Sequence, residues 1–206
     1  GVYDKMIKEM EAVGGYVVNA EEKVKLQAAM WENGVLSKYI VAQSAQSIAK
    51  HAGINMPADK TFILVPETGI GKGFPFSGEK LSPVATVYKW KEFPEAIDMV
   101  NRITTYSGPG HSCRIHTTMD SRVIELGLRV KVSRIMIRQP QCLANSGAWT
   151  NGMPMSMTLC CCSGGGNSTS SNVTWEHLLN YTWISYPIPS TQPSDLELFG
   201  TIMLED

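Results

Sequence analysis

A histidine set between glycines is the residue of this chain best suited to acid–base chemistry. His111 follows Gly108, Pro109 and Gly110 and precedes a strand-like segment, so backbone turns rather than core packing would hold its ring. Histidine is the side chain that most readily takes up and releases a proton near neutral pH. From the residues alone, a catalytic role and a structural role for His111 are about equally supported.

A carboxylate at the end of a loop is the second candidate. Glu79 lies in the segment Gly78–Pro83, with the sequence Gly-Glu-Lys-Leu-Ser-Pro, just before a predicted strand. A carboxylate at such a junction can act as a base or accept hydrogen bonds from a ribose. The residues alone favour a solvated or ion-paired glutamate.

Two glycine-rich segments invite a phosphate-binding interpretation. Residues 69–73 combine three glycines with Lys72, but a phosphate-binding P-loop needs GxxxxGK[ST] between a strand and a helix. A structural turn is therefore favoured. The second segment, Gly164–Ser168, could approach a ligand closely or form a turn.

Three consecutive cysteines, Cys160 to Cys162, raise the question of metal or redox chemistry. Structural zinc sites use pairs of cysteines spaced by two to four residues, and no second pair exists here. Small buried hydrophobic residues are favoured, with Cys161 facing away from its neighbours. The total of five cysteines is odd and no signal peptide is recognisable, which predicts reduced thiols and a cytoplasmic protein.

Alternating helices and strands must position these side chains. Helical spacing predicts helices over 3–13, 19–34, 44–50, 93–103, 120–126 and 175–179, the second capped by Asn19 with Glu22. Apolar runs predict strands over 16–18, 61–65, 84–88, 112–116, 134–137 and 181–186. This alternation predicts an α/β fold with a largely parallel sheet. We expect one domain over residues 1–186 and an extended tail over 187–206.

Composition excludes several classes of protein. The 206 residues contain 18 Lys and Arg against 19 Asp and Glu, which argues against a nucleic-acid binder with a basic surface. The 43% hydrophobic content argues against a disordered chain. No run approaches the roughly 18 apolar residues of a membrane span, so we expect no membrane partner.

Several motifs in order resemble the CoA-acylating aldehyde dehydrogenases. They are Pro75–Pro83, Gly108–Ser112, Gly164–Ser168 and Asn172–Asn180, after an opening that runs from Val2 to Gly34. Any one of these motifs is weak evidence of a resemblance, but the set in this order covers essentially the whole chain. The segments Gln139–Gly152, Tyr186–Pro189 and Glu197–Gly200 point to the sulfoacetaldehyde and succinate-semialdehyde branch.

The resemblance implies a fold and roles for individual residues. The fold is a three-layer aldehyde-dehydrogenase-type catalytic domain. Glu79, with Leu81, is expected beside the nicotinamide ribose, and His111 beside the reacting carbonyl or the CoA thiol. Four residues are expected in a substrate or CoA loop: Arg114, Asn145, Asn151 and Asn167. For Arg114, an ordinary surface position is the stronger alternative.

The family's reaction oxidises an aldehyde to an acyl-CoA through a cysteine thioester, with NAD or NADP and CoA and no metal. The matching nucleophile would lie just upstream of Gly1, as would the dinucleotide-binding domain. We therefore expect the C-terminal catalytic part of a larger enzyme, inactive alone. The family has glycine at Cys160 and Cys162 and tryptophan at Gly164, so this loop departs from its pattern.

Three functions compete. The first is the acylating dehydrogenase, with sulfoacetaldehyde as the expected substrate and succinate semialdehyde or acetaldehyde as alternatives. The second is a non-catalytic α/β module that binds CoA or assembles with itself. The third, a thiol or metal protein built on Cys160 to Cys162, fits poorly. The family assembles by pairing sheet edges, so a homodimer or higher oligomer is expected.

Overall fold

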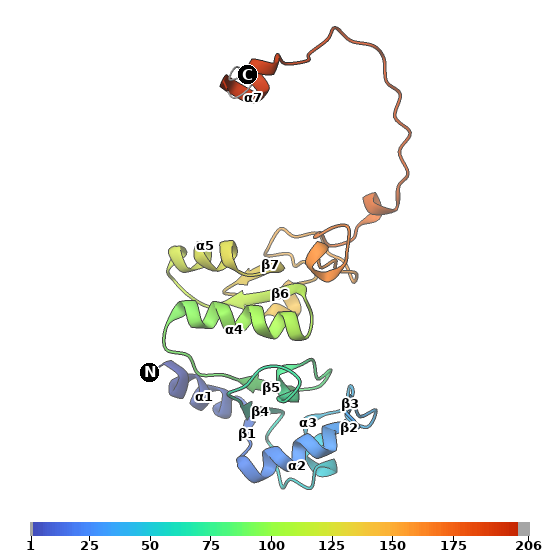
Figure 1. The fold of residues 1–206 in the computed structure, drawn as a ribbon. Coiled ribbons are helices and arrows are strands. Elements are labelled where there is room, and N and C mark those ends of the chain that lie inside the picture. The colour runs from blue at the N-terminus through green and yellow to red at the C-terminus, as the bar shows by residue number, and fades with distance from the viewer. Residues whose placement is uncertain (1, 202–206) are drawn as a thin grey trace. The chain divides into compact units, whose positions relative to one another are not determined.

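The computed structural model describes residues 2–201 and divides the chain into two units, Gly1–Thr174 and Trp175–Asp206. The first unit is a mixed α/β structure with parallel strand pairing, which confirms the predicted fold class (Figure 1). The chain divides after Thr174, earlier than the boundary expected after residue 186. The predicted domain bounds stay a prediction, and residues 202–206 of the expected tail lie outside the described residues.

One parallel sheet has the strand order β1-β4-β5, with bounds Gly15–Val17, Phe62–Pro66 and Val84–Val87. Three helices belong to this half of the unit: α1 (Val2–Ala12), α2 (Ala20–Met30) and α3 (Ala45–His51). Alternating residues of β4, Ile63 and Val65, are fully buried against Leu26 of α2 and Ile48 of α3. The predicted cap of α2 is present, since Asn19 and Glu22 exchange hydrogen bonds in a capping box.

A short hairpin replaces the end of the predicted second helix. The helix ends at Met30, and β2 (Trp31–Glu32) pairs with β3 (Val35–Leu36) in antiparallel register. The turn between them, Asn33-Gly34, has φ angles of 53° and 79°. Asn-Gly is the preferred dipeptide for such a left-handed turn, so the sequence itself indicated a hairpin at this point. The predicted helix, which ran to residue 34, was therefore too long.

A second pair of parallel strands, β6 (Gly110–Ile115) and β7 (Val132–Ile137), follows with helices α4 (Phe93–Tyr106) and α5 (Asp120–Arg129). Its smaller core is built on Ile97, Cys113 and Leu126, one residue from each of three elements. The connection from β6 to β7 runs through α5, as parallel pairing requires. Figure 1 shows α4 and α5 beside these strands.

Residues 138–174 form an irregular segment with little regular structure. It contains the single-turn helix α6 (Gln141–Ala144), the 3₁₀ turn η2 (Ser163–Gly165) and an isolated bridge between Leu159 and Asn172. The buried guanidinium of Arg134 on β7 ties this irregular segment to the strand, because its Nη2 donates to the carbonyls of Cys160 and Ser170 at 2.8 and 3.0 Å.

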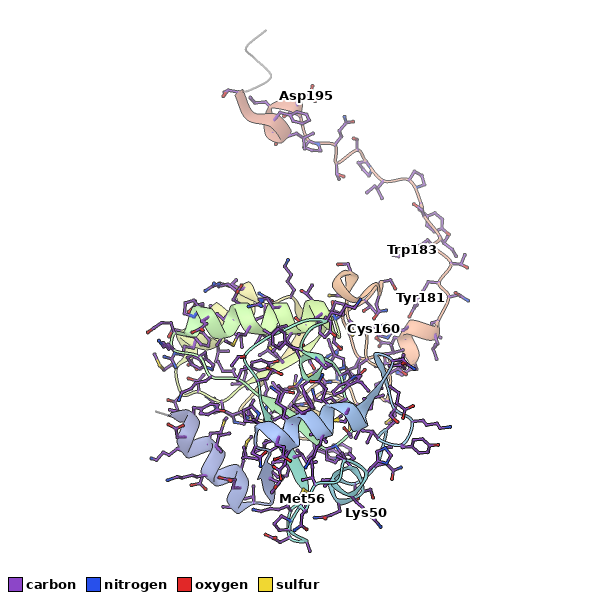
Figure 2. All side chains as sticks on the ribbon, turned by 60° about the horizontal axis from the view of Figure 1, so that its bottom comes forward. Lys50, Met56, Cys160, Tyr181, Trp183 and Asp195 are labelled. Atoms are coloured by element: carbon purple, nitrogen blue, oxygen red, sulfur yellow. The ribbon has the colours of Figure 1, made fainter. Side chains whose placement is uncertain are left out.

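The second unit has two short helices, η3 (Trp175–Leu178) and α7 (Asp195–Phe199), joined by an extended segment. The strand predicted over 181–186 is wrong for this chain, since no described residue pairs with that segment. Its aromatic and branched residues have the propensity of a strand, but a strand also needs a neighbour to hydrogen-bond. Instead Tyr181, Trp183 and Tyr186 are 69%, 93% and 80% exposed, and Figure 2 shows the first two on this segment.

Among residues 2–201, we find no helix with the length and apolar character needed to span a bilayer.

Candidate active site

Glu79 and His111, far apart in the sequence, line one cavity of about 470 Å³. Lys80, Ser107 and Ser112 line it too. A somewhat larger cavity, about 530 Å³, lies between α2, the β2–β3 hairpin and the loop at Lys72, but none of the predicted site residues lines it. The 470 Å³ cavity is therefore the candidate active site, because titratable side chains identify an active site better than the volume of a cavity does.

The loop that carries Glu79 is anchored at a buried aromatic ring. Phe76, in the 3₁₀ turn η1 (Pro75–Ser77), is fully buried and meets Trp31 edge-on with ring centroids 5.0 Å apart. Its carbonyl and that of Gly78 accept hydrogen bonds from Lys80 Nζ at 2.8 and 2.7 Å. Burial lowers the pKa of Lys80 to about 8. Lys80 thus braces the loop from inside while the side chain of Glu79 stays exposed.

Two further contacts place this loop against its surroundings. The backbone N–H of Glu79 donates to Ser107 Oγ at 2.9 Å, just after α4, which ties the loop to the segment leading to His111. Leu81 is 55% exposed with φ of +45°, and its carbonyl accepts a hydrogen bond from Ala42. Its predicted contact with the cofactor stays a prediction.

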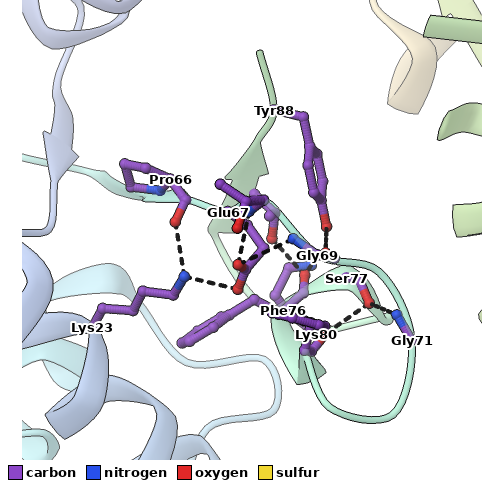
Figure 3. Close-up of polar contacts among 12 residues, drawn as sticks. Lys23, Pro66, Glu67, Gly69, Gly71, Phe76, Ser77, Lys80 and Tyr88 are labelled. Carbon is purple, nitrogen blue, oxygen red and sulfur yellow. Dashed lines mark hydrogen bonds and ion pairs between the residues drawn. The ribbon is translucent and has the colours of Figure 1, made fainter. Parts of the chain in front are cut away.

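A buried ion pair anchors the other end of the loop (Figure 3). The side chain of Glu67 is 4% exposed and lies 2.8 Å from Lys23 Nζ, and its Oε1 accepts the N–H of Thr68 at 2.8 Å. Burial by itself would raise the pKa of Glu67. The hydrogen bonds from Lys23, Thr68 and Gly69, with the charge of Lys23, outweigh burial and hold that pKa below its ordinary value.

The glycine-rich segment 69–73 is folded back on itself. Ser77 Oγ accepts the N–H of Gly71 at 2.9 Å, and the Tyr88 hydroxyl donates to the carbonyl of Gly69 at 3.1 Å (Figure 3). Burial, together with the charge of Glu67, raises the pKa of Tyr88 to about 12, so its hydroxyl keeps the proton it donates. These contacts support the structural turn over a phosphate cradle.

His111 is exposed at the start of β6, and a chain of hydrogen bonds orients its ring. Its Nδ1 lies 2.7 Å from Ser112 Oγ, and Ser112 is buried. Gln141 Nε2 on α6 donates to Ser112 Oγ at 2.8 Å and to the Ser112 carbonyl at 3.1 Å. Gln141 occupies one of the two lone pairs of the hydroxyl, which favours donation of the Ser112 proton to Nδ1. In that tautomer the neutral ring has its own proton on Nε2, where it can donate to an oxygen in the cavity.

Comparisons with known proteins show which proteins this chain resembles. No protein-family model matches the chain. It is 39% identical over 201 residues to the acylating sulfoacetaldehyde dehydrogenase of Cupriavidus necator, over 97% of this chain and 41% of that protein. A sulfoacetaldehyde dehydrogenase of an Acholeplasma species is 41% identical, over 99% and 43%. An acetylating aldehyde dehydrogenase from Geobacillus thermoglucosidasius superposes with a TM-score of 0.87 at 32% identity, over 94% and 42%.

The chain is similar to acylating aldehyde dehydrogenases over nearly its whole length. It spans less than half the length of the curated relatives it matches, 41% and 43% for the two named above. The resemblance predicted from the ordered motifs is thus confirmed, and the structure adds that the two motif residues Glu79 and His111 share a cavity.

The other four predicted site residues do not line that cavity. Arg114 is exposed on β6. The amide of Asn151 closes a turn, accepting from Ala148 and Met153 and donating to the Ala144 carbonyl. Asn167 Oδ1 accepts the N–H of Cys161 at 2.7 Å, and Asn145 is buried with an Oδ1 that has no partner. A role in binding substrate or CoA stays a prediction for all four.

The cysteine triplet differs from the sequence interpretation. Cys160, Cys161 and Cys162 are all partly exposed, so the expectation of buried hydrophobic residues is wrong. They lie in the irregular segment and not in a strand, so no core covers them. Among the described residues, no group of three His, Cys, Asp or Glu side chains could hold a metal ion.

Gln141 is the site residue that sequence reasoning missed, and its contact with Ser112 makes a testable prediction. In Gln141→Leu, Ser112 loses the donor that favours donation of its own proton to Nδ1, so we expect the proportion of the Nδ1–H form of His111 to rise several-fold. In the parent chain the Nε2–H form should dominate at a pH where the ring is neutral. Two-bond ¹H–¹⁵N NMR spectra of the imidazole distinguish the forms. Gln139→Leu, two residues earlier, is the control, and an unchanged spectrum in Gln141→Leu would contradict the relay.

Proposed function

We propose that this chain supplies part of the active site of an acylating aldehyde dehydrogenase. The enzyme would oxidise an aldehyde to its acyl-CoA with NAD or NADP and CoA, through a thioester on a cysteine encoded upstream of Gly1. The observation that carries the proposal is the single cavity lined by Glu79 and His111. All five cysteines of the chain are described, and none lines that cavity, which supports a nucleophile from elsewhere.

Each residue has a role in this proposal. His111 Nε2–H donates a hydrogen bond to the carbonyl oxygen of the aldehyde and then of the thioester, where negative charge develops during attack. The exposed carboxylate of Glu79 can accept two ribose hydroxyls, and its backbone tie to Ser107 holds it near His111. The nicotinamide accepts the hydride and CoA accepts the acyl group when they are bound. The residues present fit both groups, because the cavity offers a hydrogen-bond acceptor and a donor.

The substrate we propose is sulfoacetaldehyde, because both relatives named above carry that activity in their names. Succinate semialdehyde and acetaldehyde are the alternatives. A competition assay should show sulfoacetaldehyde consumed first; preference for either alternative would reassign the substrate.

The reaction is tested with the polypeptide encoded by the complete reading frame. We expect reduction of NAD or NADP only when both CoA and an aldehyde are present, since transfer of the acyl group to CoA releases the cysteine for the next turnover. Equal steady turnover without CoA would indicate a hydrolytic aldehyde dehydrogenase. The residues encoded before Gly1 provide a second check, and a cysteine close upstream is expected.

A non-catalytic module that binds CoA is the second candidate, favoured by the absence of a cysteine from the cavity. Isothermal titration of the 206-residue chain with CoA separates the two. Binding by the chain combined with an inactive complete polypeptide would favour the module.

We also propose that the protein self-associates and is cytoplasmic. The unpaired segment with Tyr181, Trp183 and Tyr186 exposes large apolar rings, and such surfaces usually meet another chain. Its backbone is free to add to a sheet edge of a second copy. Sizing chromatography should show a dimer or larger species, and a strict monomer at high concentration would contradict this.

A further inference from the structure

The helix that carries Gln141 is too short to hold its own position. α6 has four residues, and Pro140 before it gives no side-chain cap. An isolated helix this short is unstable in water, because it makes too few hydrogen bonds to offset the entropy lost on ordering. Contacts outside the helix must therefore set its position, and with it the position of Gln141 against Ser112.

Two asparagine side chains hold the C-terminal end of α6, where the last carbonyls of a helix need partners from outside it. Asn151 Nδ2 donates to the Ala144 carbonyl at 2.9 Å, which also accepts the N–H of Gly147 at 3.1 Å. Asn172 Nδ2 donates to the carbonyl of Asn145, the next residue, at 3.3 Å. Asn151 and Asn172 together form the asparagine clamp.

Asn172 is itself firmly placed. It is 2% exposed, and it forms a bridge with Leu159 in the segment that Arg134 ties to β7. Its Nδ2 also donates to the Pro154 carbonyl at 2.7 Å. The reverse orientation of the amide would set its oxygen against two carbonyl oxygens, so the contacts decide which atom is nitrogen. Asn172 thus connects α6 to β7, the strand that pairs with the one carrying His111.

A continuous path of hydrogen bonds leads from the clamp to His111. The N–H of Asn145 donates to the Gln141 carbonyl at 3.0 Å, so the clamped end and Gln141 belong to one helical turn. Gln141 Nε2 donates to Ser112 Oγ at 2.8 Å, and that oxygen lies 2.7 Å from His111 Nδ1. Gln141 can influence the ring only while α6 keeps it within hydrogen-bond distance of Ser112.

We propose that Asn151 and Asn172 are positioning residues for His111, acting through α6 and Gln141. Neither asparagine lines the 470 Å³ cavity. They hold Gln141 against Ser112 and thereby favour the form of His111 with its proton on Nε2. Their contribution to catalysis rests on the proposed function, whereas their effect on the ring does not. For Asn151 this role is an alternative to the predicted binding of substrate or CoA.

Asn151→Asp is the variant that tests the clamp most directly. Its carboxylate can still accept the N–H groups of Ala148 and Met153, which lie at 3.0 and 3.1 Å, but cannot donate to Ala144. In the 206-residue chain, at a pH where the ring is neutral, we expect the proportion of the Nδ1–H form of His111 to rise several-fold. Two-bond ¹H–¹⁵N NMR spectra measure it.

Asn167→Asp is the matched control for the spectra. Asn167 Oδ1 accepts the N–H of Cys161 at 2.7 Å, and a carboxylate can do the same, so the ring should keep the tautomer ratio of the parent. Asn172→Leu removes the other donor at similar volume and should also raise the Nδ1–H form, in samples that circular dichroism shows to be folded.

A double variant tests the path itself. In the Gln141→Leu background, Asn151→Asp should add nothing, because the path is already broken before it reaches Ser112. The proposal would be overturned by an unchanged ring in folded Asn151→Asp, by an equal change in Asn167→Asp, or by a full further change in the Gln141→Leu background.

Kinetics of the complete polypeptide separate positioning from binding. Asn151→Asp should lower kcat by about 10- to 100-fold with KM for aldehyde and CoA nearly unchanged, since a misplaced group slows the chemical step. Asn55→Asp, an exposed residue before β4, makes the same change of charge and should leave kcat unchanged. A raised KM with an unchanged ring would assign Asn151 to binding and overturn its positioning role. An inactive parent would remove the proposed function, while the spectra would still decide the effect of the clamp on His111.

Discussion

Replacing His111 with alanine is expected to lower kcat of the proposed acylating dehydrogenase, assayed as the polypeptide of the complete reading frame, by about 100- to 10,000-fold. The ring lines the cavity shared with Glu79, and its Nδ1 lies 2.7 Å from Ser112 Oγ, so Nε2 is the nitrogen left for a reacting oxygen. Its donor would stabilise an oxygen whose charge grows as the thiolate attacks, an interaction stronger in the transition state than in the bound aldehyde. Steady-state assays should therefore show the loss in kcat, with the KM for the aldehyde changed much less.

His116→Ala is the matched control for this experiment. His116 follows the other end of β6, is exposed, and lines none of the cavities described above. Its replacement should change kcat by less than about twofold, because it contacts no reacting group. A loss smaller than tenfold in His111→Ala, with the fold intact by circular dichroism, would remove His111 from the proposed mechanism.

Replacing Lys23 with alanine is expected to lower the free energy of unfolding by about 3 kcal/mol, because it leaves the Glu67 carboxylate buried and unpaired. Glu67 is 4% exposed on its side chain and Lys23 is 26% exposed, so the pair lies largely out of water. Lys25→Ala is the control on the same helix, since Lys25 pairs with Glu21 at the surface, with side chains 47% and 78% exposed. It should cost less than about 0.5 kcal/mol.

The effect of Lys23→Ala should depend on pH. The pKa of Glu67 in the folded chain lies below its ordinary value of 4.5, so the folded state binds this proton less readily than the unfolded state. The stabilisation is complete above pH 4.5 and is lost as the pH falls through the folded pKa. Urea titrations should show the difference between parent and variant narrowing at acid pH. A constant difference, or an equal loss in Lys25→Ala, would contradict the buried pair.

Local patterns predicted most of the regular elements. The helical spacing in α4 and the apolar run of β4 depend on neighbours in sequence, so their types follow from the residues themselves. The same local logic failed at residues 181–186, where strand propensity exists but no described segment supplies the partner. It also extended α2 across Asn33-Gly34, although that dipeptide signals a hairpin.

The sequence by itself indicated the resemblance to acylating aldehyde dehydrogenases, because the order of motifs along the chain needs no coordinates to be read, and it singled out Glu79 and His111. Only the tertiary structure placed these two in one cavity, since their approach depends on how the loop after β4 meets the start of β6. It alone connected Gln141 to His111 through Ser112. Spacing along a chain predicts local periodicity, whereas hydrogen bonds between distant segments arise only when packing brings their atoms within about 3 Å.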